Sequence, residues 1–136
     1  MTKSFVDTNL FIRYLTNDDP EKADRVENLL KQASSGVLNL ITTEMVIAEI
    51  VWVLESFYEL TPTDIAPLIR GITATPGLEV INGSLISRAL ELYEGRNFDF
   101  VDGYIAAVME KHGISDLYSF DRKHISRIHT VTRKEP

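Results

Sequence analysis

Five acidic residues occupy positions from which they could hold a metal ion through oxygen ligands: Asp7, Glu49, Asp99, Asp102 and Asp121. Carboxylates brought together repel one another, and such a cluster persists mainly when it binds a hard divalent cation. An all-oxygen ligand set suits Mg²⁺ or Mn²⁺, whose usual chemistry is the hydrolysis of phosphate esters by an activated water. The chain has no cysteine and only three scattered histidines, which argues against zinc.

The backbone that must position these acids alternates short β-rich runs with longer helical patterns. This alternation predicts an α/β fold with a central, mostly parallel sheet of four to five strands flanked by helices. The predicted strands cover residues 4–6, 37–41, 78–81, 117–120 and 129–132. The predicted helices cover residues 10–15, 20–35, 44–58, 62–74, 84–94 and 99–112. Capping signals mark four of their ends, namely Asp19-Pro20, Thr43, the capping-box pair Thr61 and Asp64, and Gly113. Since no linker or repeat interrupts the pattern, residues 1–136 are predicted to form one domain.

Four of the five acids fall where a predicted strand ends or a predicted helix begins. Asp7 and Asp121 end strands, while Asp99 and Asp102 lie in the first turn of a helix. Ligands of open α/β sheets bind outside the carboxyl ends of the strands, so we expect these four acids to share that edge. Glu49 could reach the same edge from about two turns into its helix.

Each acid also has a purely structural interpretation. Asp7 could cap the turn that follows it, and Asp121 could belong to a solvated turn. Asp99 could be a helix N-cap, with Asp102 favoured by the helix dipole. Glu49 is harder to explain in this way, because its helix is apolar nearly all round and is predicted to be buried. A buried carboxylate costs several kcal/mol unless it is paired or binds a metal.

The composition supports a local acidic site in an ordinary globular protein. The chain has 20 acidic and 14 basic residues and a net charge of −6, and without the five candidate acids 15 acids would face 14 bases. With 44% hydrophobic and 25% charged residues, it has neither a membrane-spanning run nor a signal-peptide pattern. We therefore expect a cytoplasmic protein with no membrane partner. Its bulk charge disfavours polyanions, although cations held by the acids would reverse this locally.

The acids stand in segments that resemble the motifs of PIN-domain nucleases, most closely the VapC-type toxins of type II toxin–antitoxin pairs. Residues 5–15, Phe-Val-Asp-Thr-Asn-Leu-Phe-Ile-Arg-Tyr-Leu, are similar to the first motif. Glu49 matches the acid on the helix after the second strand. Residues 98–107 are similar to the third motif, with Asp102 as principal and Asp99 as accessory acid. Residues 119–121 are similar to the last motif, where Thr is commoner than Ser119.

The resemblance implies a PIN-like domain over residues 1–136 with Mg²⁺- or Mn²⁺-dependent endoribonuclease activity. It also implies a homodimer and a cognate antitoxin protein that inhibits the enzyme. Asp7, Glu49, Asp102 and Asp121 would hold the metal, and Asp99 would ligate it or orient a bound water. Residues that would support the site by hydrogen bonds are Thr8, Asn9 and Ser119. Candidate RNA contacts are Arg13, Arg96, Arg122 and Lys123, the last two at the start of a basic tail, residues 122–136, which has five basic residues and one acidic residue.

Two other function classes are open at this point. A non-catalytic PIN-like module that binds RNA or a protein would be expected to lack some of the acids, and all of them are present. A receiver-like or phosphatase-like domain with an Asp nucleophile would need a second acid beside the strand-end Asp, or a Lys near the last strand. Asp7 is followed by Thr8-Asn9 and Asp121 by Arg122-Lys123, so the sequence fits this class poorly.

Overall fold

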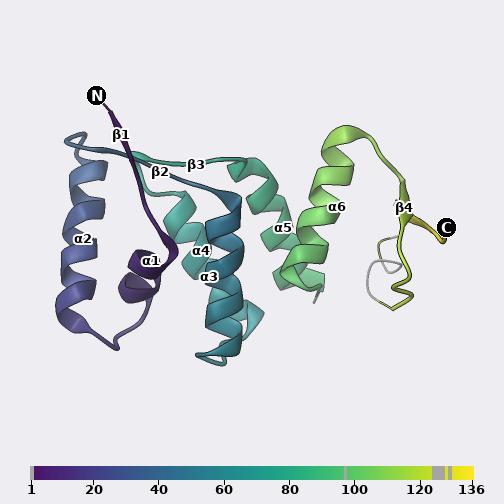
Figure 1. The fold of residues 1–136 in the computed structure, drawn as a ribbon, viewed down its shortest axis with the longest axis horizontal. Coiled ribbons are helices and arrows are strands. Elements are labelled where there is room, and N and C mark those ends of the chain that lie inside the picture. Colours follow the sequence, from purple (N-terminus) through teal and green to yellow (C-terminus); the bar gives the residue numbers. More distant parts are fainter. Residues whose placement is uncertain (1, 97, 124–127, 129) are drawn as a thin grey trace. The chain divides into compact units, whose positions relative to one another are not determined.

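The computed structural model describes residues 2–96, 98–123, 128 and 130–136, and the chain divides into two compact units, Met1–Gly83 and Ser84–Pro136. The first unit contains a parallel three-stranded sheet in the order β1-β2-β3 (Figure 1). Its strands are β1 (Lys3–Phe5), β2 (Asn39–Thr42) and β3 (Leu78–Val80). Its helices are α1 (Thr8–Leu15), α2 (Pro20–Ser34), α3 (Glu44–Ser56) and α4 (Pro62–Thr73).

Helices α2, α3 and α4 begin after the capping residues that the sequence predicts, whereas α1 begins at Thr8, two residues before its predicted start. The Asp19 side chain accepts a hydrogen bond from the first turn of α2, and Pro20 follows at the first helical position. Thr43 caps α3 in the same way. Thr61 and Asp64 form the reciprocal capping box of α4. These starts are therefore confirmed.

Close packing in the first unit fixes helix α1 and the turn that precedes β3. Helix α1 contacts both α2 and α3 and lies between them in Figure 1. Its Phe11 is fully buried, as are Ile47 and Ile50 of α3. Before β3, Gly77 has a φ of +80°, and a Cβ atom there would lie 2.1 Å from the Ala33 carbonyl oxygen. Only glycine fits this approach of the chain to α2.

The second unit contains two packed helices and a pair of parallel strands. They are α5 (Gly83–Arg96), α6 (Phe100–His112), β4 (Asp116–Tyr118) and β5 (Thr132–Lys134). The rings of Tyr93 and Phe100 pack edge to face with centroids 5.9 Å apart. A Cβ atom at Gly103 would lie 2.9 Å from the Ala89 carbonyl oxygen, so α5 and α6 touch at the backbone. No helix among the described residues is long and apolar enough to cross a membrane.

The predicted α/β class and the parallel strand direction are confirmed. The five strands found among the described residues pair as a three-stranded and a two-stranded sheet, whereas we expected one central sheet. The fourth strand ends at Tyr118 instead of residue 120, because the chain turns at Ser119. The last strand is Thr132–Lys134, not 129–132, and His129 lies outside the described residues. That residues 1–136 form one domain stays a prediction.

Candidate active site

Asp7 stands in the turn between β1 and α1, on backbone that is tied to β2. Its Oδ1 accepts a 2.7 Å hydrogen bond from the Thr8 backbone N–H and so caps α1. The preceding residue, Val6, donates its N–H to the Ile41 carbonyl at 2.9 Å. The Val6 carbonyl accepts a 3.0 Å hydrogen bond from the fully buried Thr42 hydroxyl. The cap uses one carboxylate oxygen, so the structural and the metal-binding interpretations of Asp7 are compatible.

The expectation that Glu49 is buried is wrong. Glu49 is exposed and shares one side of α3 with Met45, which is 76% exposed, and Trp52, which is 65% exposed. The opposite side of the helix is buried through Ile47, Ile50 and Leu54. The amino-acid composition of α3 does not show that only one side of the helix packs in the core. An exposed carboxylate keeps its hydration and has no burial cost for a metal to offset, so a metal-binding role of Glu49 depends on which residues lie beside it.

Asp7 and Glu49 line the same cavity of the first unit, which has a volume of about 530 Å³. Its other lining residues are Thr8, Asn9, Ile12, Arg13, Asp18, Val53, Phe57 and Tyr58. We call it the acidic cavity, because three carboxylates line it. The guanidinium of Arg13 has no hydrogen bond or ion pair with any residue that the structure describes. The cavity can therefore offer oxygen ligands to a cation and a charged donor to an anion.

Asp18 and Tyr58, which no sequence pattern indicated, face each other in the acidic cavity. The Tyr58 hydroxyl donates a hydrogen bond to Asp18 Oδ2 and joins the loop after α1 to the loop after α3. The two residues are 40 positions apart, and no local pattern links them. The neighbouring Asp19-Pro20 signal indicated only a helix start.

Thr8 and Asn9 line the acidic cavity in different ways. Thr8 is only 7% exposed, and its hydroxyl has no hydrogen-bond partner among the described residues. Thr8 therefore bonds to the site residue Asp7 through its backbone N–H, while its side chain forms no bond there. A buried hydroxyl without a partner costs about 1–3 kcal/mol, and a ligand in the cavity could relieve this cost. Asn9 is exposed.

In the second unit, Asp99 and Asp102 stand at the start of α6. Asp99 occupies the N-cap position, but its exposed carboxylate makes no capping hydrogen bond. Asp99 is therefore the N-cap residue that the sequence suggests, but its side chain does not contribute to the cap. Asp102 is half-buried in the first turn of the helix.

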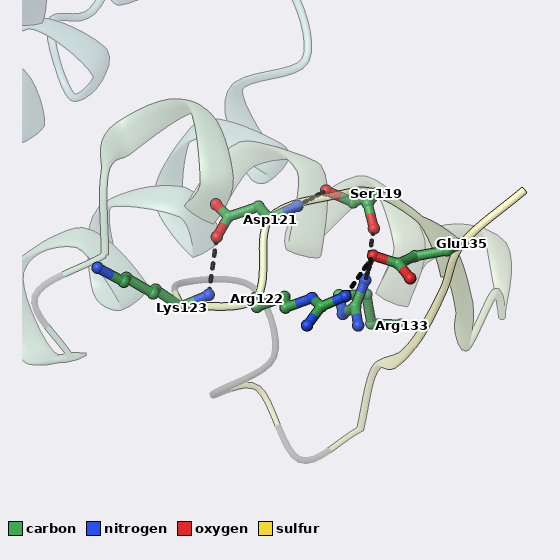
Figure 2. A network of polar contacts seen from close by, with 6 residues as sticks. All are labelled: Ser119, Asp121, Arg122, Lys123, Arg133 and Glu135. Atoms are coloured by element: carbon green, nitrogen blue, oxygen red, sulfur yellow. Dashed lines mark hydrogen bonds and ion pairs between the residues drawn. The ribbon is translucent and has the colours of Figure 1, made fainter.

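Asp121 follows β4 in a loop that hydrogen bonds hold on both sides. Its backbone N–H donates to Ser119 Oγ at 3.0 Å, and its Oδ1 accepts from the Lys123 backbone N–H at 2.9 Å. Figure 2 shows this loop next to Arg133 of β5, whose Nη1 donates to the Ser119 carbonyl at 2.8 Å. Arg133 also pairs with Glu135 at 3.1 Å. No sequence pattern indicated that Arg133 orders the Asp121 loop.

The candidate RNA contacts differ in how free their charges are. Arg96 and Lys123 are exposed, and their side chains form no ion pair with described residues. Arg122 pairs with Glu135 at 3.3 Å (Figure 2). Since Glu135 also pairs with Arg133, one carboxylate offsets part of the charge of the basic tail.

A family model described as "PIN domain" matches residues 4–129. The chain belongs to the PIN-domain family. A VapC ribonuclease of Aquifex aeolicus (strain VF5) is 28% identical over 118 residues, which is 87% of this chain and 87% of that protein. The crystal structure of Mycobacterium tuberculosis VapC20, described as a sarcin–ricin loop cleaving toxin, aligns over 93% of this chain and 94% of that chain. Its TM-score is 0.37 and its sequence identity is 20%. The resemblance to PIN domains is confirmed.

The donor chemistry of this PIN domain fits a divalent cation. Among the residues that the structure describes, no three His, Asp or Glu side chains lie close enough together to hold a metal. Mg²⁺, however, keeps several waters and is commonly bound by one or two carboxylates together with substrate phosphates. Asp7 and Glu49 supply two carboxylates to one cavity, beside the unpartnered Thr8 hydroxyl. The acidic cavity of the PIN domain thus has a donor set suited to Mg²⁺ or Mn²⁺.

Proposed function

We propose that this PIN domain is an Mg²⁺- or Mn²⁺-dependent endoribonuclease and the toxin of a toxin–antitoxin pair. The observation that carries the proposal is the acidic cavity, to which Asp7 and Glu49 contribute from separate elements. Their carboxylates match the acids that the family motifs predict. The VapC ribonuclease that resembles the chain over 87% of its length supports RNA as the substrate.

The proposed metal-holding and catalytic residues are Asp7, Glu49, Asp102 and Asp121, with Asp99 as a ligand or as the acid that orients a water. The metal ion would activate water and stabilise the charge that develops on the phosphodiester. The position of Asp121 depends on its bonds to Ser119 and Lys123. The Asp99 carboxylate makes no capping bond, which leaves it available for this role.

Other residues of the acidic cavity would bind and orient the RNA. Arg13 would donate to phosphate oxygens, because its guanidinium has no partner among the described residues and a planar guanidinium matches phosphate geometry. The Thr8 hydroxyl would donate to a ligand oxygen or to water. Asn9 offers both a donor and an acceptor. Arg96, Arg122 and Lys123 are proposed as further phosphate contacts.

The proposal extends to the partners and the location that the family suggests. A cognate antitoxin would inhibit the enzyme, and two copies of the chain would form a homodimer. Exposed apolar side chains on and after α3 support a dimer surface, namely Met45, Trp52 and Phe57, whose exposed fractions are 76%, 65% and 78%. The proposed location is the cytoplasm, where the RNA substrate would be.

An RNA-cleavage assay with Mn²⁺, with EDTA and with Mn²⁺ added back tests the proposal. We expect cleavage with Mn²⁺, none with EDTA, and recovery on adding Mn²⁺ back. A calorimetric Mn²⁺ titration of the same protein distinguishes the main alternative, a non-catalytic module that binds RNA or a protein. Absence of both cleavage and Mn²⁺ binding would favour that module.

A further inference from the structure

A second cavity of the first unit lies against α1 and α2 and has a volume of about 440 Å³. Its lining residues are Asn9, Leu10, Arg13, Lys22, Arg25, Val26 and Leu29. Three of them are cationic, and no acidic residue of the described chain lines it. We call it the basic cavity. Its size lies within the range of about 300–1,000 Å³ that is typical of small-ligand sites.

The charges of the basic cavity are largely available to a ligand. Arg13 and Arg25 form no hydrogen bond or ion pair with any residue that the structure describes. Lys22 faces Asp19 only at 3.9 Å, a long and exposed ion pair. Cations collected around a concave surface without an acid favour an anionic ligand.

The basic and the acidic cavities share part of their lining. Asn9 and Arg13 line both cavities. An RNA strand that leaves the acidic cavity past these two residues therefore enters the basic cavity. The basic cavity also offers apolar side chains, those of Leu10, Val26 and Leu29, beside its cations. This combination matches a nucleotide, which carries a phosphate beside an apolar base face.

We propose that the basic cavity binds a nucleotide of the RNA strand that flanks the phosphate held in the acidic cavity. The phosphate of this nucleotide contacts Arg25 and Lys22, and its base packs on Val26 and Leu29. Arg13, at the shared wall, contacts the phosphate between the two cavities. This assignment rests on the proposed ribonuclease function and extends it to the path of the substrate.

The test compares Arg25→Ala and Lys22→Ala with Lys31→Ala, which removes a charge from the same helix outside both cavities. Lys31 is exposed and pairs with Glu27, and it lines neither cavity. Binding of a fluorescent ten-residue oligouridine is measured by anisotropy in EDTA over a range of salt concentrations. In EDTA the RNA stays intact, so binding is read without cleavage.

We expect Arg25→Ala and Lys22→Ala each to weaken RNA binding about three- to tenfold and to reduce the salt slope by about 0.7. Lys31→Ala should leave both quantities near the wild-type values. With Mn²⁺, the two cavity variants should raise KM and leave kcat within about twofold, because Lys22 and Arg25 line only the basic cavity, to which none of the proposed metal ligands contributes.

Equal effects of Arg25→Ala and Lys31→Ala would overturn the assignment, since bulk charge would then explain the loss. It would also be overturned if the cavity variants bound RNA normally but bound a ten-residue oligoglutamate less tightly than the wild type, because the cavity would then take a protein segment. Failure of the proposed function looks different: the wild-type protein would bind the oligouridine and respond to Arg25→Ala but would not cleave RNA with Mn²⁺.

Discussion

Replacing Asp7 by asparagine separates the two roles of this carboxylate. Asparagine is as good an N-cap as aspartate, and its side-chain oxygen can accept the 2.7 Å bond from the Thr8 N–H. The free energy of unfolding without metal should therefore change by less than about 0.5 kcal/mol. Asp7→Ala, which removes the cap, should cost about 1 kcal/mol. A folded Asp7→Asn variant thus tests charge at the site with little structural change.

The metal-dependent effects of Asp7→Asn should be much larger. A metal ion present at a hundred times its dissociation constant stabilises the wild-type protein by about 2.7 kcal/mol. For a chain of this size, that is a rise in Tm of roughly 10 °C. Asp7→Asn should lose most of this rise. If the metal contributes about 3 kcal/mol to the transition state, cleavage should fall by roughly two orders of magnitude.

Thermal unfolding with Mn²⁺ and with EDTA, run beside the cleavage assay, measures both effects. Asp24→Asn is the matched control, because Asp24 is exposed on α2 and lines neither cavity. The control should keep the Mn²⁺-induced rise in Tm and the cleavage rate. Undiminished cleavage by folded Asp7→Asn would remove Asp7 from the site, and an equal loss in Asp24→Asn would make the effect one of net charge.

Three further predictions concern the scaffold. Gly77→Ala should cost about 3–5 kcal/mol in chemical denaturation, because a Cβ at a φ of +80° would meet the Ala33 carbonyl at 2.1 Å; wild-type stability would contradict this contact. Thr42→Val should cost about 1–2 kcal/mol by the same measurement, since it leaves a buried carbonyl after β1 without its 3.0 Å bond; a neutral effect would show that this bond is dispensable. Hydrogen bonds from Arg88 lower the pKa of Glu110. The Arg88–Glu110 pair should add about 0.5 kcal/mol to the free energy of unfolding. This stabilisation should be complete above the ordinary glutamate pKa of about 4.3 and lost as the pH falls through the lowered pKa of Glu110. The stability of Glu110→Gln should therefore converge with that of the wild type in acid, and a constant difference would refute the pairing.

Local signals in the sequence were sufficient for the element order and most helix boundaries. The cap at Asp19, the capping box of Thr61 and Asp64, and Gly113 with its φ of +65° after α6 stand where the sequence predicts them. Such signals are readable because a capping bond joins residues only a few positions apart. The order of the acidic motifs likewise sufficed to recognise the PIN-domain family.

The tertiary structure decided which side of each element meets solvent and which distant residues meet one another. It exposed Glu49 on a helix whose composition predicted burial, and it brought Glu49 and Asp7 to one cavity. It also placed Arg133 against the Asp121 loop and gathered Arg13 and Arg25 at the basic cavity. None of these outcomes is encoded in a short window. An apolar helix can bury any of its sides, and the side it buries depends on the neighbours against which it packs.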